Sequence, residues 1–418
     1  MAVFKFSSFW KSVFLIFFFS LLVRLIYFSV PRTYPFEPQP GVLISDASNY
    51  DEGALNIIYG KGYQFGGWRA QKPPLYSIFL AGHYALLGRN LILVKLTQAL
   101  LASLTTIFIF LIGRRLFGDL VGMLAALFHI IYLPYLQYTF VIMTETLLFF
   151  LMTTAIYSFL LASDSRKFHY FTISGFAAGL AVLTKSSAII LIGILSLWFF
   201  IRFLIEKYYS QKKFFLSTII FLLSFFLTIT PWLVRNWLIF GDTTLSTVGA
   251  SHFWPATNPK YGSWNPKAQN EMYYRFGQNV NELEWEKAVY KDAFRMIARY
   301  PKFYLAGCIK NIQDFWRINP KRIIYLIKTP LSIKFDEIIT MWASLGLLLL
   351  ILQKRLVHCC FFLLIIFVFT FENMTVTTVD RYRWQIDWLL AILASFPIAM
   401  LLSSKIAKSI FTLFFQKQ

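Results

Sequence analysis

Long apolar runs separated by short polar turns recur along most of the chain. Such runs can cross a membrane as helices, because about 20 residues at about 1.5 Å each cover the hydrocarbon layer. We expect ten spans, at residues 9–30, 91–112, 119–139, 146–162, 170–184, 186–205, 214–232, 338–352, 356–371 and 386–402. The pattern therefore predicts an all-α polytopic membrane protein.

Two of the apolar runs need separate interpretation. The first, at 9–30, follows Lys5 and is not followed by a small-residue cleavage site, so we expect an uncleaved signal-anchor. It contains Arg24, which either has a function in the membrane or reaches its surface. The run from Leu75 to Gly88 covers only about 21 Å as a helix, and we interpret it as interfacial.

Basic residues in the short turns indicate how the chain is oriented. Four turns are basic, at Arg114–Arg115, Arg166–Lys167, Arg202–Lys213 and Lys354–Arg355. If 75–88 is interfacial, all four basic turns lie on the same side of the membrane. The positive-inside rule then makes that side cytoplasmic, and both termini lie there too. Segments 31–90 and 237–337 then lie outside. We divide the chain into an N-terminal catalytic module (1–236), a large outer loop (237–337) between spans seven and eight, and C-terminal helices (338–418).

Composition and charge narrow the function. With 57% hydrophobic and 14% charged residues, the chain has too little polar surface for a soluble protein. Its net charge is nevertheless +20, and only 15 of the 40 Lys and Arg residues lie on the expected cytoplasmic side. The other 25 lie in the outer segments or at outer helix ends. This favours an anionic ligand at the outer face rather than a nucleic acid.

The segment from residue 45 to 63, SDASNYDEGALNIIYGKGY, holds the first candidate acid. Read as a helix, it places Asp46, Asn49 and Tyr50 on one face and turns Asp51 and Glu52 away. Asp46 is then the acid best placed to face a cavity at the membrane. The alternative is that Asp46, or the preceding serine, only caps the helix.

Two further candidates lie in neighbouring outer segments. Lys72, in QKPPLY, is held by two prolines at the level of a lipid phosphate, although a snorkelling lysine would look the same. Glu145, in TETL, sits in an outer turn where a lone carboxylate is costly unless it is used or paired. A capping role there suits Thr144 better.

Five cations share one expected depth although they come from widely separated segments of the chain, the last two of them from one motif. They are Lys72, Lys185, Arg235, Arg381 and Arg383. Each alone would be an interface anchor, but together they predict a cradle for phosphate. Residues 251–264 add aromatic side chains, Trp254 among them, which suit either sugar stacking or an interfacial belt. The scattered histidines make a histidine-built metal site improbable on spacing.

Seven motifs in order resemble the GT-C superfamily of membrane glycosyltransferases. They are the 45–63 segment, QKPPLYSIFLAGHYALLG, GRRLFG, TETL, GLAVLTK, PWLVRN and RYRWQID. The resemblance is to the group of protein O-mannosyltransferases and lipid A aminoarabinose transferases (glycosyltransferase family 39 type). Two departures are Ser186, where the family often has proline, and weak similarity through 265–337.

The resemblance implies a GT-C-like bundle that transfers a sugar from a polyprenyl-phosphate donor to a lipid, glycan or protein. Asp46 would be the general base and Glu145 the second acid, with or without a divalent cation. Lys72 and the other four cations would bind the donor phosphate, and Tyr50, Tyr382 and Trp254 the substrates. We expect a bacterial inner membrane, with the site facing the periplasm. A transporter or flippase is the alternative, but the sequence has no internal repeat.

Overall fold

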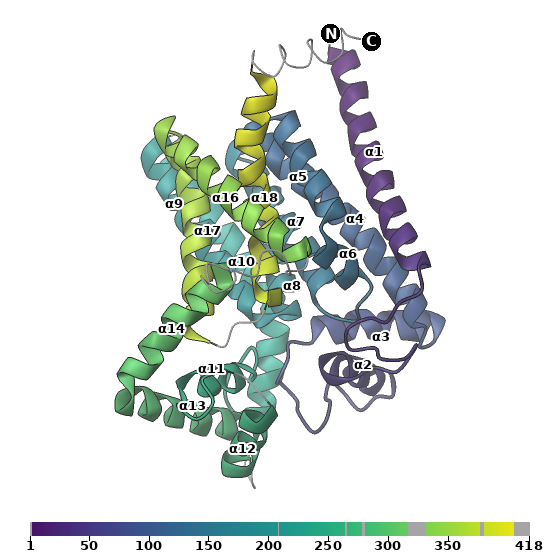
Figure 1. The fold of residues 1–418 in the computed structure, drawn as a ribbon, viewed down its shortest axis with the longest axis vertical. Coiled ribbons are helices and arrows are strands. Elements are labelled where there is room, and N and C mark those ends of the chain that lie inside the picture. Colours follow the sequence, from purple (N-terminus) through teal and green to yellow (C-terminus); the bar gives the residue numbers. More distant parts are fainter. Residues whose placement is uncertain are drawn as a thin grey trace.

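The computed structural model describes residues 2–207, 209–263, 266–277, 281–316, 331–376 and 380–404, and regular structure there is helical (Figure 1). Eight helices in these ranges contain a segment long and apolar enough to cross a membrane. They are α1 (Ala2–Ser29), α4 (Leu91–Phe117), α7 (Glu145–Ser165), α9 (Ile190–Glu206, preceded by the short η1, Ser186–Ile189), α10 (Gln211–Phe240), α16 (Leu331–Leu352), α17 (Leu356–Thr375) and α18 (Asp380–Ser403). The expected all-α polytopic membrane architecture is confirmed.

The span expected at 119–139 is two helices, α5 (Asp119–Ile131) and α6 (Leu133–Thr139), which are bent by 59°. Pro134 lies in the first turn of α6, where its ring disfavours helical backbone in the preceding residue and it has no N–H to donate back to α5. Counted as one broken span, the pair raises the number in the described ranges to nine.

The one expected span not yet accounted for, at 170–184, corresponds to α8 (Phe168–Thr184). Its 17 residues cover about 26 Å, somewhat less than the hydrocarbon layer. Gly175 and Gly179 let α8 approach α10 closely, because an added Cβ at Gly175 would lie 2.3 Å from the Phe221 carbonyl oxygen. This helix is therefore packed tightly inside the bundle despite its length.

The four basic turns gather at one end of the bundle. Arg115 at the end of α4 and Arg202 on α9 both pair with Asp164 at the end of α7. The guanidinium of Arg355 lies over the ring of Phe117, which brings the turn before α17 to the same end. The grouping inferred from the sequence is thus present in the fold.

Arg24 does not reach the membrane surface. It is fully buried on α1, where its guanidinium donates to Ser20 and lies 3.3 Å from His129 Nδ1 on α5. Thr106 of α4 also hydrogen-bonds His129. Arg24 therefore joins three helices, and snorkelling is excluded as its explanation.

The opposite end of the bundle carries α2 (Ser45–Ile58) and α3 (Leu75–Leu87), which lie side by side (Figure 1). The run at 75–88 is thus a helix of 13 residues, too short to span, and in Figure 1 it lies at a steep angle to α1 and α4. Its neighbour α2 is fixed to it by the Tyr84 hydroxyl, which donates to Asp51 over 2.7 Å. The contact with α3 thus fixes the position of α2, which carries the candidate residue Asp46.

Residues 249–299 form three helices with a core of their own, α11 (Gly249–Thr257), α12 (Pro266–Phe276) and α13 (Glu282–Arg299). We call these three helices the loop domain; α14 (Pro301–Trp316) connects it toward the bundle (Figure 1). Glu282, at the start of α13, accepts hydrogen bonds from the backbone N–H groups of Arg69 and Ala70. The loop domain is thereby fixed against the chain just before Lys72.

Candidate functional site

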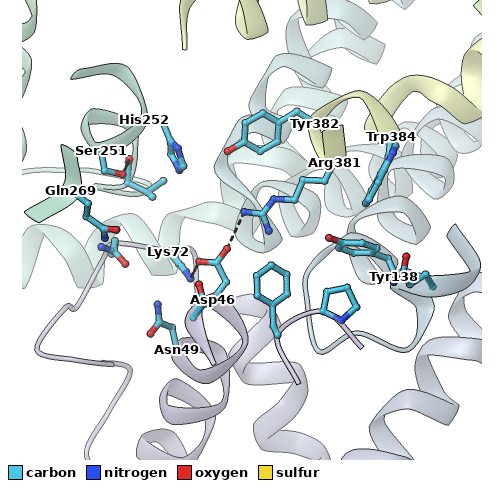
Figure 2. A pocket seen from close by; sticks show the side chains of 16 residues that line it. Asp46, Asn49, Lys72, Tyr138, Ser251, His252, Gln269, Arg381, Tyr382 and Trp384 are labelled. Carbon is cyan, nitrogen blue, oxygen red and sulfur yellow. Dashed lines mark hydrogen bonds and ion pairs between the residues drawn. The ribbon is translucent and has the colours of Figure 1, made fainter. Parts of the chain in front are cut away.

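A cavity of about 750 Å³ lies between the loop domain and the ends of the membrane helices (Figure 2). We call it the large chamber. Six parts of the chain line it, which are the segment before α2, α2 itself, the segment before α3, α6, the loop domain with the residue before it, and the start of α18. The lining residues are Pro35, Phe36, Ser45, Asp46, Asn49, Gln71, Lys72, Gln137, Tyr138, Val248, Ser251, His252, Gln269, Arg381, Tyr382 and Trp384.

Asp46 lies in the middle of this chamber, clamped between two cations (Figure 2). Lys72 Nζ donates to Asp46 Oδ1 over 2.7 Å, and Arg381 Nη2 donates to Asp46 Oδ2 over 3.0 Å. Burial alone would raise the pKa of Asp46, but these two cations outweigh burial and hold the pKa well below its usual range. Asp46 is therefore ionised at neutral pH.

Asp46 faces the chamber because of its position in α2. The helix begins at Ser45, and no side chain caps its N-terminus, so the capping explanation for Asp46 and Ser45 is wrong. Asn49 lines the chamber beside Asp46, whereas Asp51 packs toward α3 and Glu52 accepts from the Gly66 N–H. The helical wheel drawn from the sequence placed these side chains correctly.

Lys72 is held rigidly against Asp46. The Tyr63 hydroxyl donates to the carbonyl oxygens of Lys72 and Pro73, and the Lys72 ammonium lies 4.5 Å from the centre of the Tyr50 ring. Pro73 and Pro74 then lead directly into α3. The two prolines and Tyr63 fix the backbone at Lys72. The hydrogen bond to Asp46 then holds the lysine side chain in the chamber.

A second cavity of about 80 Å³, the small chamber, shares Asp46, Lys72, Val248, His252, Arg381 and Tyr382 with the large one. Its other lining residues are Tyr50, Pro73, Met143, Thr144, Glu145, Thr184, Lys185 and Ser186. Its charged lining consists of three cations, Lys72, Lys185 and Arg381. Two carboxylates, Asp46 and Glu145, complete it. Its size and charge suit a small anion.

Glu145 and Lys185 enter the small chamber from neighbouring helices. Glu145 is the first residue of α7 and is 1% exposed. Within the described residues its carboxylate accepts one long hydrogen bond, 3.5 Å, from the Thr144 hydroxyl, and Oε1 has no partner. Lys185 follows the last residue of α8, and its ammonium lies 4.9 Å from the centre of the Tyr382 ring. The structure thus gathers both predicted residues near Asp46.

Arg383 is not part of the site. It is 1% exposed, and its Nε donates to Asp387 Oδ1 over 2.9 Å while Nη2 donates to the carbonyl oxygen of Asp336. Arg383 lines neither chamber. The prediction failed because residues two apart on a helix point about 200° apart, so Arg381 and Arg383 cannot face one cavity.

Arg235 and Trp254 also lie outside both chambers. Arg235 donates to the backbone carbonyl oxygens of Arg69 and Tyr63, over 2.6 and 2.8 Å, and so ties α10 to the segment that carries Lys72. Trp254 is fully buried in the loop domain, where its Nε1 donates to Asp292 over 2.8 Å. Both residues support the site from outside it.

His252 is a site residue that the sequence did not single out. It lines both chambers, although it comes from α11 in the loop domain. The pKa of His252 is lowered to about 4, mainly by burial. The positive charges of Arg381, Lys185 and Lys72 also lower it, and the negative charge of Asp46 offsets only part of the shift. Its imidazole is therefore neutral at pH 7. The motif SHFW contained this residue, but only the fold brings it to Asp46.

The chambers do not offer a suitable donor set for a divalent cation. Among the described residues, no group of three or more His, Cys, Asp or Glu side chains is arranged to hold a metal ion. Both oxygens of Asp46 already accept from cationic side chains. A divalent ion would have to compete with Lys72 and Arg381 at the same carboxylate, so we derive no step through a metal.

Residues 71–232 match the family model of dolichyl-phosphate-mannose-protein mannosyltransferases. The matched segment includes Lys72, Glu145 and Lys185, and it ends before the loop domain. No curated protein matches the chain. The family match therefore includes eight of the 14 residues that line the small chamber. It leaves the rest of the chain unassigned.

Solved structures extend the likeness to nearly the whole chain. The oligosaccharyltransferase of Archaeoglobus fulgidus in its apo form superposes with a TM-score of 0.60 at 12% identity, over 97% of this chain and 52% of that one. The same enzyme tethered to an acceptor peptide gives a TM-score of 0.60, also at 12% identity, over 97% and 51%. ArnT from Cupriavidus metallidurans, bound to undecaprenyl phosphate, matches at 13% identity over 95% and 78%, with a TM-score of only 0.39.

The family match over 71–232 and the fold shared with the archaeal oligosaccharyltransferase bear out the predicted resemblance to GT-C membrane glycosyltransferases. At such low identity the oligosaccharyltransferase shows a shared fold and nothing more. The chain spans about half the length of that archaeal enzyme. What the chain does must therefore be argued from its own chambers.

Proposed function

We propose that the chain is a membrane glycosyltransferase that transfers a sugar from a polyprenyl-phosphate donor to an acceptor hydroxyl. The observation that carries this proposal is the placement of Asp46. It lies at the boundary between a small cationic chamber and a large polar one, with a cation on each oxygen. The match to a mannosyltransferase family over residues 71–232 supports the same class of donor.

In this proposal the small chamber takes the donor phosphate. Lys72, Lys185 and Arg381 line a space of about 80 Å³ there. As the sugar leaves, the phosphate gains the electron pair of the broken bond to the anomeric carbon. Fixed cations in a partly buried site stabilise that developing charge more than water would, which is how such groups accelerate a reaction.

Asp46 acts as the general base. The acceptor oxygen bonds to the anomeric carbon, its proton moves to Asp46, and the bond from that carbon to the phosphate oxygen breaks. In the structure both Asp46 oxygens are occupied, and the low pKa makes Asp46 a weak base. An incoming phosphate can take over donors of Lys72 and Arg381, which raises the pKa of Asp46 and frees an oxygen for the proton.

Glu145 has a supporting role in this scheme. Its carboxylate lines the small chamber together with Lys185, and its negative charge acts on both Lys185 and Arg381. Removing Glu145 would leave three cations facing Asp46 alone. Glu145 therefore balances the charge of the chamber while no phosphate is bound.

The test uses purified protein in lipid nanodiscs with polyprenyl phosphates carrying mannose, glucose or a pentose. The unaltered protein should release free polyprenyl phosphate from one of them. Asp46→Asn should keep the fold and lower turnover by a factor of about 10²–10⁴, because the amide cannot accept the proton. The matched control is Glu52→Gln, an exposed acid of the same helix. Full turnover by Asp46→Asn contradicts the assignment of the base.

We further propose that the chambers face the outside of a bacterial inner membrane. The four basic turns lie at the other end of the bundle, and such turns favour the cytoplasm. A cysteine replacing Pro266, in a chain whose own three cysteines are changed to alanine, should react with an impermeant thiol reagent in cells with a permeabilised outer membrane. Labelling only after the inner membrane is opened would reverse the orientation.

A further inference from the structure

The large chamber has two chemically different ends, with Asp46 between them (Figure 2). On one side lie Ser251 and Gln269 of the loop domain, and on the other lie Tyr138 and Trp384 of the membrane helices. We call the first the polar end, formed by Asn49, Ser251 and Gln269 together with Gln71, which shares the neighbour Tyr273 with Gln269. The second is the aromatic end, where Tyr138 and Trp384 lie and where α6 also contributes the amide of Gln137. A transfer reaction needs two substrates that meet at one base, and this arrangement provides a place for each.

The two ends differ in how they can be reached. Tyr138 belongs to α6 and Trp384 to α18, so the aromatic end adjoins the membrane-spanning helices. The polar end is covered by α11 and α12, which lie beyond the bundle (Figure 1). A lipid-linked donor approaches along the membrane helices, which leaves the polar end to the acceptor.

Three side-chain amides and one hydroxyl make up the polar end, and none carries a charge. An amide both donates and accepts hydrogen bonds, and so does each hydroxyl group of a sugar ring. A lipid acceptor would need an apolar surface at this place. A peptide bound in extended form would need a strand edge to pair with, and the described residues form isolated bridges but no strand.

The polar end is also held in a fixed arrangement. Burial raises the pKa of Tyr273, and the neighbouring side chains of Gln269 and Gln71 oppose this shift, so the Tyr273 hydroxyl lies between the segment before α3 and α12. The Ser246 hydroxyl also donates to the carbonyl oxygen of Gln71 over 2.6 Å, which fixes the backbone of that segment. Behind Gln269, Ala268 and Met272 are fully buried in the core of the loop domain. Hydrogen-bonding groups that are already fixed lose little entropy when a ligand binds, which favours specific recognition.

From this chemistry we infer that the acceptor is a saccharide, whose ring is bound by Asn49, Gln71, Ser251 and Gln269, so that the protein extends a glycan. The inference rests on the proposed function, since it names the acceptor of that same site. A sugar hydroxyl attacks the anomeric carbon, its proton passes to Asp46, and the phosphate leaves with the bonding electrons. The chamber volume of about 750 Å³ has room for roughly two sugar rings, one from each substrate.

The experiment measures how acceptors change the release of polyprenyl phosphate from the donor that the protein accepts. One arm adds a mixture of short α- and β-linked oligosaccharides, another adds serine- and threonine-containing peptides, and a third adds diacylglycerol in the nanodisc. The oligosaccharides should stimulate release and gain one sugar by mass spectrometry. Stimulation by peptides or lipid alone overturns the inference.

Variants of the polar end sharpen the result. Gln269→Leu should raise the KM for the oligosaccharide about three- to tenfold, which corresponds to one lost hydrogen bond. The matched control is Asn270→Leu, an exposed amide one residue further along α12 that does not line the chamber. Asn49→Ala provides a second, independent variant on α2. Unchanged KM in both polar-end variants contradicts the assignment.

The two proposals fail in different ways. If the protein releases polyprenyl phosphate slowly without any acceptor but no oligosaccharide stimulates it, the saccharide inference is wrong and the proposed donor reaction stands. If no donor reacts under any condition, the proposed function is wrong and the acceptor inference falls with it.

Discussion

Arg381 and Arg383 stand two residues apart at the start of α18, yet they lie in opposite surroundings. Arg381 reaches into a chamber and shares Asp46 with Lys72. Arg383 is enclosed in the bundle, where Asp387, Asp336 and Thr340 take up its donors. The Tyr132 hydroxyl closes that second network by donating to Asp336 and Asp387.

The difference shows what makes a buried cation available to a ligand. The network of Arg383 lines neither chamber, and the partners just named lie on α16 and α18 and in the break between α5 and α6, so no ligand space adjoins it. Arg381 lines both chambers, and its partner Asp46 also accepts a hydrogen bond from Lys72. A phosphate can compete for Arg381 and has no route to Arg383.

The largest effect is expected at the enclosed arginine. Arg383→Met leaves the buried carboxylate of Asp387 without its cation, and breaking such a pair costs about 3–5 kcal/mol. The melting temperature in detergent and the yield of folded protein should both fall sharply. The double variant Arg383→Met with Asp387→Leu should recover part of the loss, because it removes the charge as well. Unchanged stability of the single variant would contradict the structural role.

A smaller effect, and a different one, is expected at Arg381. Arg381→Gln removes one charged hydrogen bond, worth about 1.5–3 kcal/mol, so kcat/KM for the donor should fall about 10- to 100-fold. The melting temperature should stay close to that of the unaltered protein, because the remaining partner of Asp46 is Lys72. A loss of stability as large as that of Arg383→Met would remove the distinction between the two arginines.

A third buried ionisable side chain, Glu286 in the loop domain, forms no ion pair among the described residues, and its effect should be smaller than that of Arg383 and confined to high pH. Burial raises the pKa of Glu286 to about 7, and the neighbouring Glu282 adds to the shift. Because the unfolded chain loses this proton near its usual value of 4.5, folding stability falls as pH rises from 4.5 to 7.

Glu286→Gln should therefore stabilise the protein at pH 8, by at most about 3 kcal/mol, and leave it unchanged near pH 4.5. Thermal melting at both pH values measures this difference. Glu284→Gln, an exposed acid on the same helix that caps its start, is the matched control and should show no such pH dependence. Equal stabilisation at both pH values would rule out the buried acid as the cause.

The sequence was sufficient for the parts of the site that depend on local pattern. Apolar run lengths predicted the membrane helices, and helical periodicity predicted that Asp46 and Asn49 share a face while Asp51 turns away. The double proline marked the position of Lys72. These predictions needed only geometry within one helix or one turn.

The remaining site residues depend on contacts between distant segments. Arg381 and Asp46 are 335 residues apart, and Gln269 and His252 reach the chamber only because Glu282 fixes the loop domain on the chain beside Lys72. No local pattern encodes such docking. The error at Arg383 is of another kind, since the angle between neighbouring helical positions was enough to exclude it.

The break between α5 and α6 has a consequence for how the sequence can vary. The seven residues of α6 begin after a 59° bend and carry Gln137 and Tyr138 to the chamber wall. Inserting or deleting one residue between Pro134 and Gln137 would turn both side chains by about 100°. Because α6 has only seven residues, no other part of the helix can compensate for such a change. Descendants of this chain can therefore exchange residues in α6, yet they must conserve its length.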